Sequence, residues 1–171
     1  MESIKKNYNY LLFSFILISV LSWLLEIAYS LIFRHVLVNP GTLYGPYCPI
    51  YGLAFILIIL VCNKKDNIFL KVIKIGVIST VVEYVISFIC EKLYHIRVWD
   101  YSDKFLNING RVCLEMSVLF TILGIAVIYL IGPLTKKIYD KLGSWVKYLN
   151  IFLAVIMVSD LTVTLITKAY I

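Results

Sequence analysis

Charged residues are scarce in this chain of 171 residues: Asp, Glu, Lys and Arg make up 15% of it, while 61% is hydrophobic. Soluble domains carry about a quarter charged residues and about 45–50% apolar ones. A soluble domain of this length has too little interior to bury so much apolar side chain. The composition therefore excludes most soluble classes and indicates an integral membrane protein.

Several catalytic and cofactor-binding motifs are absent as well. The sequence has no H-E-x-x-H zinc motif, no G-x-S-x-G nucleophile elbow and no Walker A phosphate loop, and its four cysteines form no C-x-x-C pair. No metal site is predicted, and the motifs name no cofactor. The net charge of +6 comes with no basic helix and no basic stretch interleaved with aromatics, so a nucleic-acid partner is not expected.

What the chain has instead is five long apolar segments. A helix needs about 20 residues to cross a bilayer. The second segment is shorter than that, so it is either a short span or one that begins inside the preceding loop. Runs this continuous favour helices over barrel strands. We predict one membrane domain over residues 1–171, an all-α polytopic bundle of about five transmembrane helices. The predicted spans are 9–33, 49–62, 69–90, 112–132 and 148–167.

The lysines and arginines give these spans an orientation, because cytoplasmic loops carry an excess of both. Ten of the 16 fall on the side that holds the N-terminus and the loops after the second and fourth spans. We therefore expect a multi-pass protein of the cell membrane with a cytoplasmic N-terminus and an external C-terminus. The ten residues are Lys5, Lys6, Lys64, Lys65, Lys71, Lys74, Lys136, Lys137, Lys141 and Lys147.

Four acidic residues lie inside or at the edge of predicted spans. A charge there costs at least about 2.5–3.5 kcal/mol, so such residues face the bundle, pair or become protonated. In the predicted topology Glu26, Glu83, Glu115 and Asp160 all fall in the outer half of the membrane. Two interpretations stay open: interhelical hydrogen bonds that fix the bundle, or a polar pocket that opens outward.

Two outer loops, at about 34–48 and 91–111, would cover these acids. The first contains NPGTLYGPYCPIYG (39–52) and is either a plain external turn or a loop that dips into the bundle, with Pro49 in the first turn of the second span. In the second loop, Arg111 precedes Glu115 by one helical turn and is expected to approach it. The residues predicted to line the pocket and its opening are Glu26, Tyr44, Glu83, Glu91, Trp99, Asp100, Tyr101, Asn107, Asn109, Arg111, Glu115 and Asp160.

Longer motifs in the same regions carry a family resemblance. NPGTLYGPYCPIYG (39–52), the Glu83-Tyr84 pair, WDYS (99–102) and FLNINGRVCLE (105–115) resemble the CmpB type of ABC-transporter permease, a family of bacterial multi-pass membrane proteins. The resemblance covers about residues 20–133. Pro40 departs from it, since the family more often has Arg there, which removes one cation from the outer loop. The resemblance implies a role related to transport in a bacterial inner membrane.

The first functional hypothesis is therefore a transport or permease component whose acidic pocket binds a cation or a small polar substrate. Its partners would be the lipid bilayer and either other permease subunits or further copies of this chain. Two alternatives stay open. One is an integral-membrane enzyme that acts on a lipid or cell-wall precursor, with carboxyl groups in general acid–base roles. The other is a structural or regulatory membrane protein in which the acids only lock the bundle.

Overall fold

The computed structural model describes residues 7–37, 39–40, 43–63, 65–94 and 97–168. Within these ranges the regular structure is helical, apart from one isolated antiparallel bridge between Ile108 and Val112. This confirms the predicted all-α class. In chain order the elements are α2 (Tyr8–Tyr29), the π-helical turn η1 (Ser30–Arg34), α3 (Pro49–Val61), α4 (Ile68–Tyr94), α5 (Leu114–Ala126), the π-helical turn η2 (Val127–Ile131), α6 (Gly132–Leu142) and α7 (Trp145–Lys168).

Among the described residues, four helical stretches are long and apolar enough to cross a membrane. The second predicted span corresponds to α3, which is apolar but shorter. The chain is therefore a multi-pass membrane protein by the length and composition of its helices. The four long stretches are Tyr8–Ile32, Ile68–Leu93, Leu114–Leu142 and Trp145–Thr167.

Local sequence explains where two of the helices begin. The side chain of Asn7 caps α2, because its Oδ1 accepts a hydrogen bond from the backbone N–H of Tyr10 at 3.1 Å. Pro49 lies in the first turn of α3, where its missing N–H breaks no helical hydrogen bond. This is the position predicted for it.

The helix that follows the second loop extends beyond the predicted end of the fourth span at residue 132. It continues through α5, η2 and α6 to Leu142. A proline inside a helix removes one hydrogen bond and its ring clashes with the preceding turn. Here the π-helical turn η2 comes directly before α6, so Pro133 occupies the first turn of a new helical segment. The Gly132-Pro133 pair therefore changes the helix type without ending the helix.

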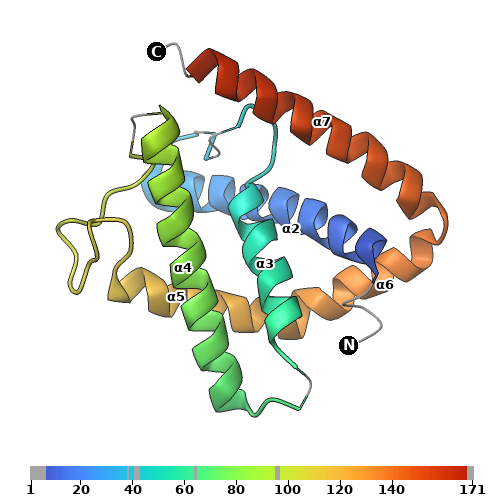
Figure 1. The fold of residues 1–171 in the computed structure, drawn as a ribbon, viewed down its shortest axis with the longest axis horizontal. Helices are drawn as coiled ribbons and strands as arrows, with labels where there is room; N and C mark the ends of the chain where they lie inside the picture. Colours follow the sequence, from blue (N-terminus) through green and yellow to red (C-terminus); the bar gives the residue numbers. More distant parts are fainter. Residues whose placement is uncertain (1–6, 38, 41–42, 64, 95–96, 169–171) are drawn as a thin grey trace.

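The helices are arranged in two crossing directions (Figure 1). Helices α3 and α4 lie side by side and cross α2 and the α5–α6 helix steeply, while α7 returns from α6 along α2. The two loops of the sequence analysis, between η1 and α3 (the first loop) and between α4 and α5 (the second loop), lie toward the same part of the molecule. The α6–α7 turn lies far from them.

Small residues allow these helices to approach closely. A Cβ on Gly52 of α3 would lie 2.4 Å from Ser19 Oγ and 2.5 Å from the carbonyl oxygen of Phe15, so α2 and α3 touch through this glycine. In the same way, the side chain of Ile75 of α4 occupies the space beside Gly124 of α5. Such contacts are typical of helices packed in a membrane. Most other large apolar side chains of the long helices are exposed, as a lipid-facing surface requires.

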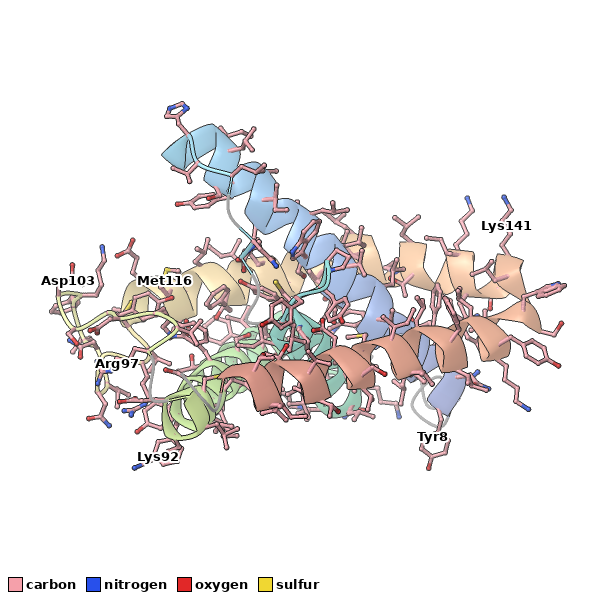
Figure 2. The ribbon with its side chains drawn as sticks, turned by 90° about the horizontal axis from the view of Figure 1, so that it is seen from above. Tyr8, Lys92, Arg97, Asp103, Met116 and Lys141 are labelled. Atoms are coloured by element: carbon pink, nitrogen blue, oxygen red, sulfur yellow. The ribbon has the colours of Figure 1, made fainter. Side chains whose placement is uncertain are left out.

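The two ends of the molecule differ in character (Figure 2). Lys92, Arg97 and Asp103 lie at one end, which we call the loop end, and Tyr8 and Lys141 lie at the other, which we call the lysine end. The predicted topology places these two groups on opposite sides of the membrane. Lys5, Lys6 and Lys64, which the orientation also used, lie outside the described residues.

Polar contacts join the helices at the lysine end. Asn7 Nδ2 donates to the hydroxyl of Tyr139 at 3.1 Å, and Asn150 Nδ2 donates to the carbonyl oxygen of Asn9 at 2.8 Å. These bonds tie the start of α2 to α6 and α7. The four cysteines are free thiols.

Candidate functional site

The first loop is bonded to α2. The backbone N–H of Cys48 donates to the carbonyl oxygen of Ser19 at 2.9 Å, and the indole N–H of Trp23 donates to Asn39 Oδ1 at 2.8 Å. Tyr47 and Cys48 are buried. These contacts favour a loop that dips into the bundle over a plain external turn.

Asp160 of α7 holds the first loop from the other side, an arrangement we call the Asp160 clamp. Its Oδ1 accepts from the backbone N–H of Tyr44 at 3.2 Å, and its Oδ2 accepts from that of Gly45 at 2.7 Å. The hydroxyl of Tyr47 donates to Oδ2, and that of Thr164 donates to Oδ1 at 3.2 Å. Burial and the neighbouring carboxylate raise the pKa of Tyr47 above its ordinary value, so this hydroxyl keeps its proton. The carboxylate of Asp160 is thus used to join α7 to the first loop.

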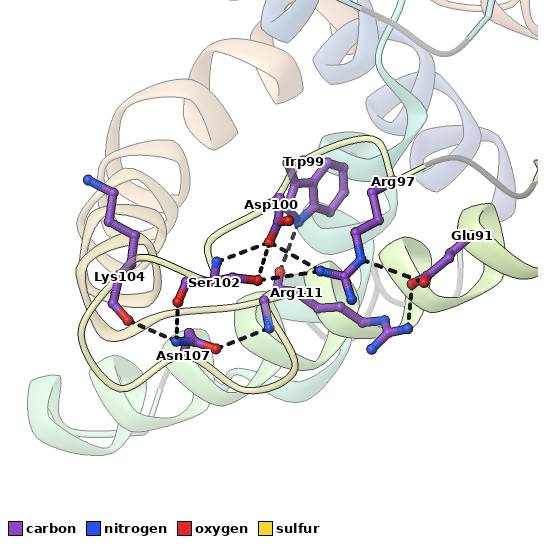
Figure 3. Close-up of polar contacts among 9 residues, drawn as sticks. Glu91, Arg97, Trp99, Asp100, Ser102, Lys104, Asn107 and Arg111 are labelled. Atoms are coloured by element: carbon purple, nitrogen blue, oxygen red, sulfur yellow. Dashed lines mark hydrogen bonds and ion pairs between the residues drawn. The ribbon is translucent and has the colours of Figure 1, made fainter.

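The second loop is built around the carboxylate of Asp100 (Figure 3). Asp100 Oδ1 accepts from the hydroxyl of Ser102 at 2.5 Å, from the backbone N–H of Ser102 at 3.0 Å and from Arg97 Nη1 at 3.1 Å. These hydrogen bonds and the guanidinium lower the pKa of Asp100. Gly110 lies against the same group at φ +68°, and a Cβ there would lie 2.5 Å from Asp100 Oδ1. No other residue fits this position without strain.

A second set of hydrogen bonds closes the loop on itself. Asn107 Nδ2 donates to the carbonyl oxygen of Ser102 at 3.2 Å, and Asn107 Oδ1 accepts from the backbone N–H of Gly110 at 3.1 Å. The indole N–H of Trp99 donates to the carbonyl oxygen of Arg111 at 2.8 Å. The side chains of Asn107 and Trp99 therefore stabilise the fold of the second loop through hydrogen bonds to its own backbone.

Three side chains fasten the second loop to α4. Asn109 Nδ2 donates to the hydroxyl of Tyr84 at 2.9 Å. The Arg111 guanidinium pairs with Glu91 Oε2 and lies 5.6 Å from the centre of the Tyr84 ring. Arg97 Nε approaches Glu91 Oε1 at 3.6 Å, so two guanidinium groups share one carboxylate (Figure 3).

The expected approach of Arg111 to Glu115 is wrong. Cys113 is extended at φ −143° and ψ 164°, and α5 begins only at Leu114, so Arg111 is not on the helix that carries Glu115. Glu115 is exposed and lies 3.7 Å from the ammonium of Lys104.

Two of the membrane acids meet at a pair of tyrosines, a group we call the Glu26–Glu83 cluster. The hydroxyl of Tyr51, in the first turn of α3, donates to Glu26 Oε1. The hydroxyl of Tyr101, from the second loop, is hydrogen bonded to Glu83. Tyr101 also interacts electrostatically with Glu26 and with Tyr51. The cluster thus joins α2, α3, α4 and the second loop.

Glu83 is the most enclosed acid of the cluster. The residue is 4% exposed, and its Oε2 is buried with no hydrogen-bond partner. None of the ion pairs among the described residues involves Glu83. Among the described residues, the polar contact of Glu83 is with the hydroxyl of Tyr101. Burial and the Glu83 carboxylate raise the pKa of the Tyr101 hydroxyl, which therefore donates its proton to the bond.

The thiol of Cys48 lies next to this cluster. Burial, and to a lesser degree the nearby Glu26 carboxylate, raises the pKa of Cys48 to about 12. The thiol is therefore protonated at neutral pH and behaves as a small apolar group.

The predicted site residues fall into four groups. Glu26, Glu83 and Tyr101 come together in the cluster. Glu91, Trp99, Asp100, Asn107, Asn109 and Arg111 form the network of the second loop and its attachment to α4. Tyr44 and Asp160 belong to the Asp160 clamp, and Glu115 lies apart from all of them.

Sequence reasoning missed four polar residues of the site. Tyr51 and Tyr47 are the hydroxyl donors to Glu26 and Asp160, and Trp23 with Asn39 ties the first loop to α2. The signal available for Tyr51 was its place in the first turn after Pro49, which points it toward the loop end. The other two pairings, Tyr47 with Asp160 and Trp23 with Asn39, depend on how the loop folds back, which spacing alone does not define.

The fold and the site define a multi-pass helical membrane protein with a polar cluster beneath two ordered loops. The family model described as "Putative ABC-transporter type IV" matches residues 13–165, and the chain belongs to this family. This confirms the CmpB-type resemblance and identifies a membrane transport component. No curated protein and no solved structure matches the chain.

Proposed function

We propose that this chain is the membrane-embedded subunit of a permease and that its Glu26–Glu83 cluster binds a small monovalent cation: a proton, an alkali metal ion or the ammonium group of a substrate. The observation that carries the proposal is the enclosed carboxylate of Glu83, whose partner Tyr101 also interacts electrostatically with Glu26 and which has one buried oxygen without a partner. A buried carboxylate inside a membrane is neutralised by a proton or a cation.

The surrounding chemistry supports a cation rather than an anion. Arg97 and Arg111, the arginines of the second loop, pair with Glu91 and Asp100. Among the described residues, these two guanidinium groups are therefore paired outside the cluster. Both tyrosine hydroxyls donate to carboxylates, so their oxygen lone pairs are left to face a positive ligand.

The donor set also limits the charge of the ligand. In the part of the chain that the structure describes, no group of three or more His, Cys, Asp or Glu side chains could hold a metal ion. Divalent ions bound entirely by protein need more oxygen ligands than two carboxylates supply. A singly charged ligand fits two carboxylates and two hydroxyls better.

The topology supports a cluster that opens to the outside. The lysine-rich end would face the cytoplasm under the positive-inside rule, which puts the N-terminus inside, the C-terminus outside and the loop end at the outer leaflet of a bacterial inner membrane. Since the sequence contains no Walker A motif, ATP hydrolysis by that route would come from a separate subunit.

Isothermal titration of the purified protein tests the proposal. Na⁺, K⁺ and ethylammonium would be titrated at pH 6 and pH 8, with N-methylglucamine chloride holding the ionic strength constant. Binding of one of these ions, or a pH-dependent proton release on binding, is expected in the wild type and is lost in Glu83→Gln. Asp103→Asn removes an exposed carboxylate at the same end and should bind like the wild type. If Glu83→Gln binds as the wild type does, or if no ion binds and the wild type and Glu83→Gln take up the same number of protons between pH 8 and pH 6, the proposal fails.

A further inference from the structure

A second polar feature lies at the loop end, on the outer side of α4, and it has the opposite charge. The side chains there are Arg97, Arg111, Lys92, Glu91 and Asp100. The carboxylate of Glu91 is shared by both arginines, and that of Asp100 pairs with Arg97. Three cations therefore face two carboxylates, and the group has one positive charge in excess.

This excess lies at a cleft. An open cleft of about 320 Å³ is lined by Phe88, Glu91, Lys92 and Arg111. The guanidinium of Arg111 lies 5.5 Å from the centre of the Phe88 ring, and the ammonium of Lys92 lies 5.8 Å from it. The two cations are thus held on the same aromatic side chain beside the cleft.

Arg111 has a donor that the protein does not use. Its Nη2 pairs with Glu91, but its Nε is buried and has no hydrogen-bond partner. Leaving a buried donor of a charged group unpaired costs free energy, and an acceptor would relieve this cost if a small shift of the neighbouring side chains opened Nε to the cleft. The side chain of Arg111 is only 12% exposed, so its position is fixed by the packing around it.

We propose that this cleft binds a phosphate group through Arg111 and Lys92. A guanidinium offers several N–H donors in a planar fork that matches phosphate oxygens, and a neighbouring ammonium adds a compact charge for another oxygen. Glu91 orients Arg111, and its own two oxygens are occupied by arginines.

The surface around the cleft bears on the source of the phosphate. Phe88 is part of the cleft and is 42% exposed, and Val85 and Ile89 on the same helix are exposed apolar residues. An acyl chain could therefore lie along α4 below a phosphate held in the cleft. The phosphate belongs either to a lipid headgroup or to a free phosphate compound, and the binding chemistry is the same in both.

Native mass spectrometry of the protein released from a maltoside detergent tests this site. Three probes are added separately: inorganic phosphate, phosphatidylglycerol and diacylglycerol, which has the acyl chains without the phosphate. Lys92→Gln and Arg111→Gln each remove one cation of the cleft. Lys104→Gln is the matched control, because Lys104 lies at the same end of the molecule and pairs with Glu115 outside the cleft.

We expect a bound phosphate compound whose affinity falls about tenfold in each cleft variant, as for the loss of one charge-assisted hydrogen bond, and stays unchanged in Lys104→Gln. Phosphatidylglycerol retained without inorganic phosphate would identify a lipid as the source, and retention of inorganic phosphate would identify a free phosphate. Lys92 is exposed on the surface of α4, so its variant should fold even if that of Arg111 does not. Equal retention of diacylglycerol, equal affinity in Lys92→Gln and the wild type, or no retention of either phosphate compound would overturn the proposal.

Discussion

Replacing Asp160 by Asn should release the first loop from α7. The carboxylate accepts four hydrogen bonds, two of them from the backbone N–H groups of Tyr44 and Gly45, one on each oxygen. In Asp160→Asn one oxygen becomes an NH₂ group. Whichever oxygen is replaced, one backbone N–H then faces a donor and loses its partner, while the hydroxyls of Tyr47 and Thr164 can turn to accept.

The size of the effect follows from this count. A hydrogen bond to a charged group contributes about 1.5–3 kcal/mol in mutational series, and hydrogen bonds in membrane proteins average about 0.6 kcal/mol. Because Asp160 is only partly buried, we expect a loss of about 1–3 kcal/mol in the free energy of unfolding. For a chain of this length that lowers the unfolding temperature by roughly 2–12 °C.

The assay is thermal unfolding in a maltoside detergent, followed by tryptophan fluorescence, with alkylation of Cys48 as a local measure of the loop. Asp160→Asn should unfold at a lower temperature and expose Cys48 to alkylation below that temperature. Asp103→Asn, in the exposed second loop, is the control for loss of a carboxylate. Equal unfolding temperatures and equal Cys48 alkylation in the two variants would refute the reasoning.

Three further predictions follow from the close contacts at Gly52 and Gly110 and from the raised pKa of the Cys48 thiol. Gly52→Ala should lower stability by about 1–3 kcal/mol in the same unfolding assay, because its Cβ would lie 2.4 Å from Ser19 Oγ; unchanged stability would mean that α2 and α3 are farther apart. Alkylation of Cys48 in the wild type should be slow at pH 8 and rise about tenfold per pH unit, since its pKa is about 12 and only the thiolate reacts; a plateau near pH 9 would contradict this. Gly110→Ala should destabilise more than Gly143→Ala by thermal unfolding, because both have positive φ but only Gly110 is closely surrounded; equal effects would show that the second loop is loosely packed.

The helices could be predicted from the sequence because each depends on a long apolar segment. The fourth predicted span, 112–132, was too short, because Gly132-Pro133 is a common signal for the end of a helix. The π-helical turn η2, which lets the helix continue to Leu142, leaves no sign in the sequence pattern. Pro49 was placed correctly because its effect on the first turn of a helix is local.

The candidate site was only partly predictable. In the structure Glu26 and Glu83 are linked through Tyr51 and Tyr101, whereas the sequence grouped them with Asp160 and Glu115 by depth alone. In the structure Asp160 accepts hydrogen bonds from the first loop, and Glu115 pairs with Lys104. The partners of these carboxylates depend on how the loops fold. The tyrosine donors could not be predicted for the same reason.

The most direct test of the central claim is a double-mutant cycle on cation binding. Affinity for the ion identified by titration would be measured in the wild type, Glu26→Gln, Glu83→Gln and the double variant. If the two carboxylates hold one ligand, each single variant weakens binding at least about tenfold, and the double variant departs from additivity by about 1 kcal/mol or more. Strictly additive effects, or wild-type affinity in either single variant, would contradict a shared cation site at the Glu26–Glu83 cluster.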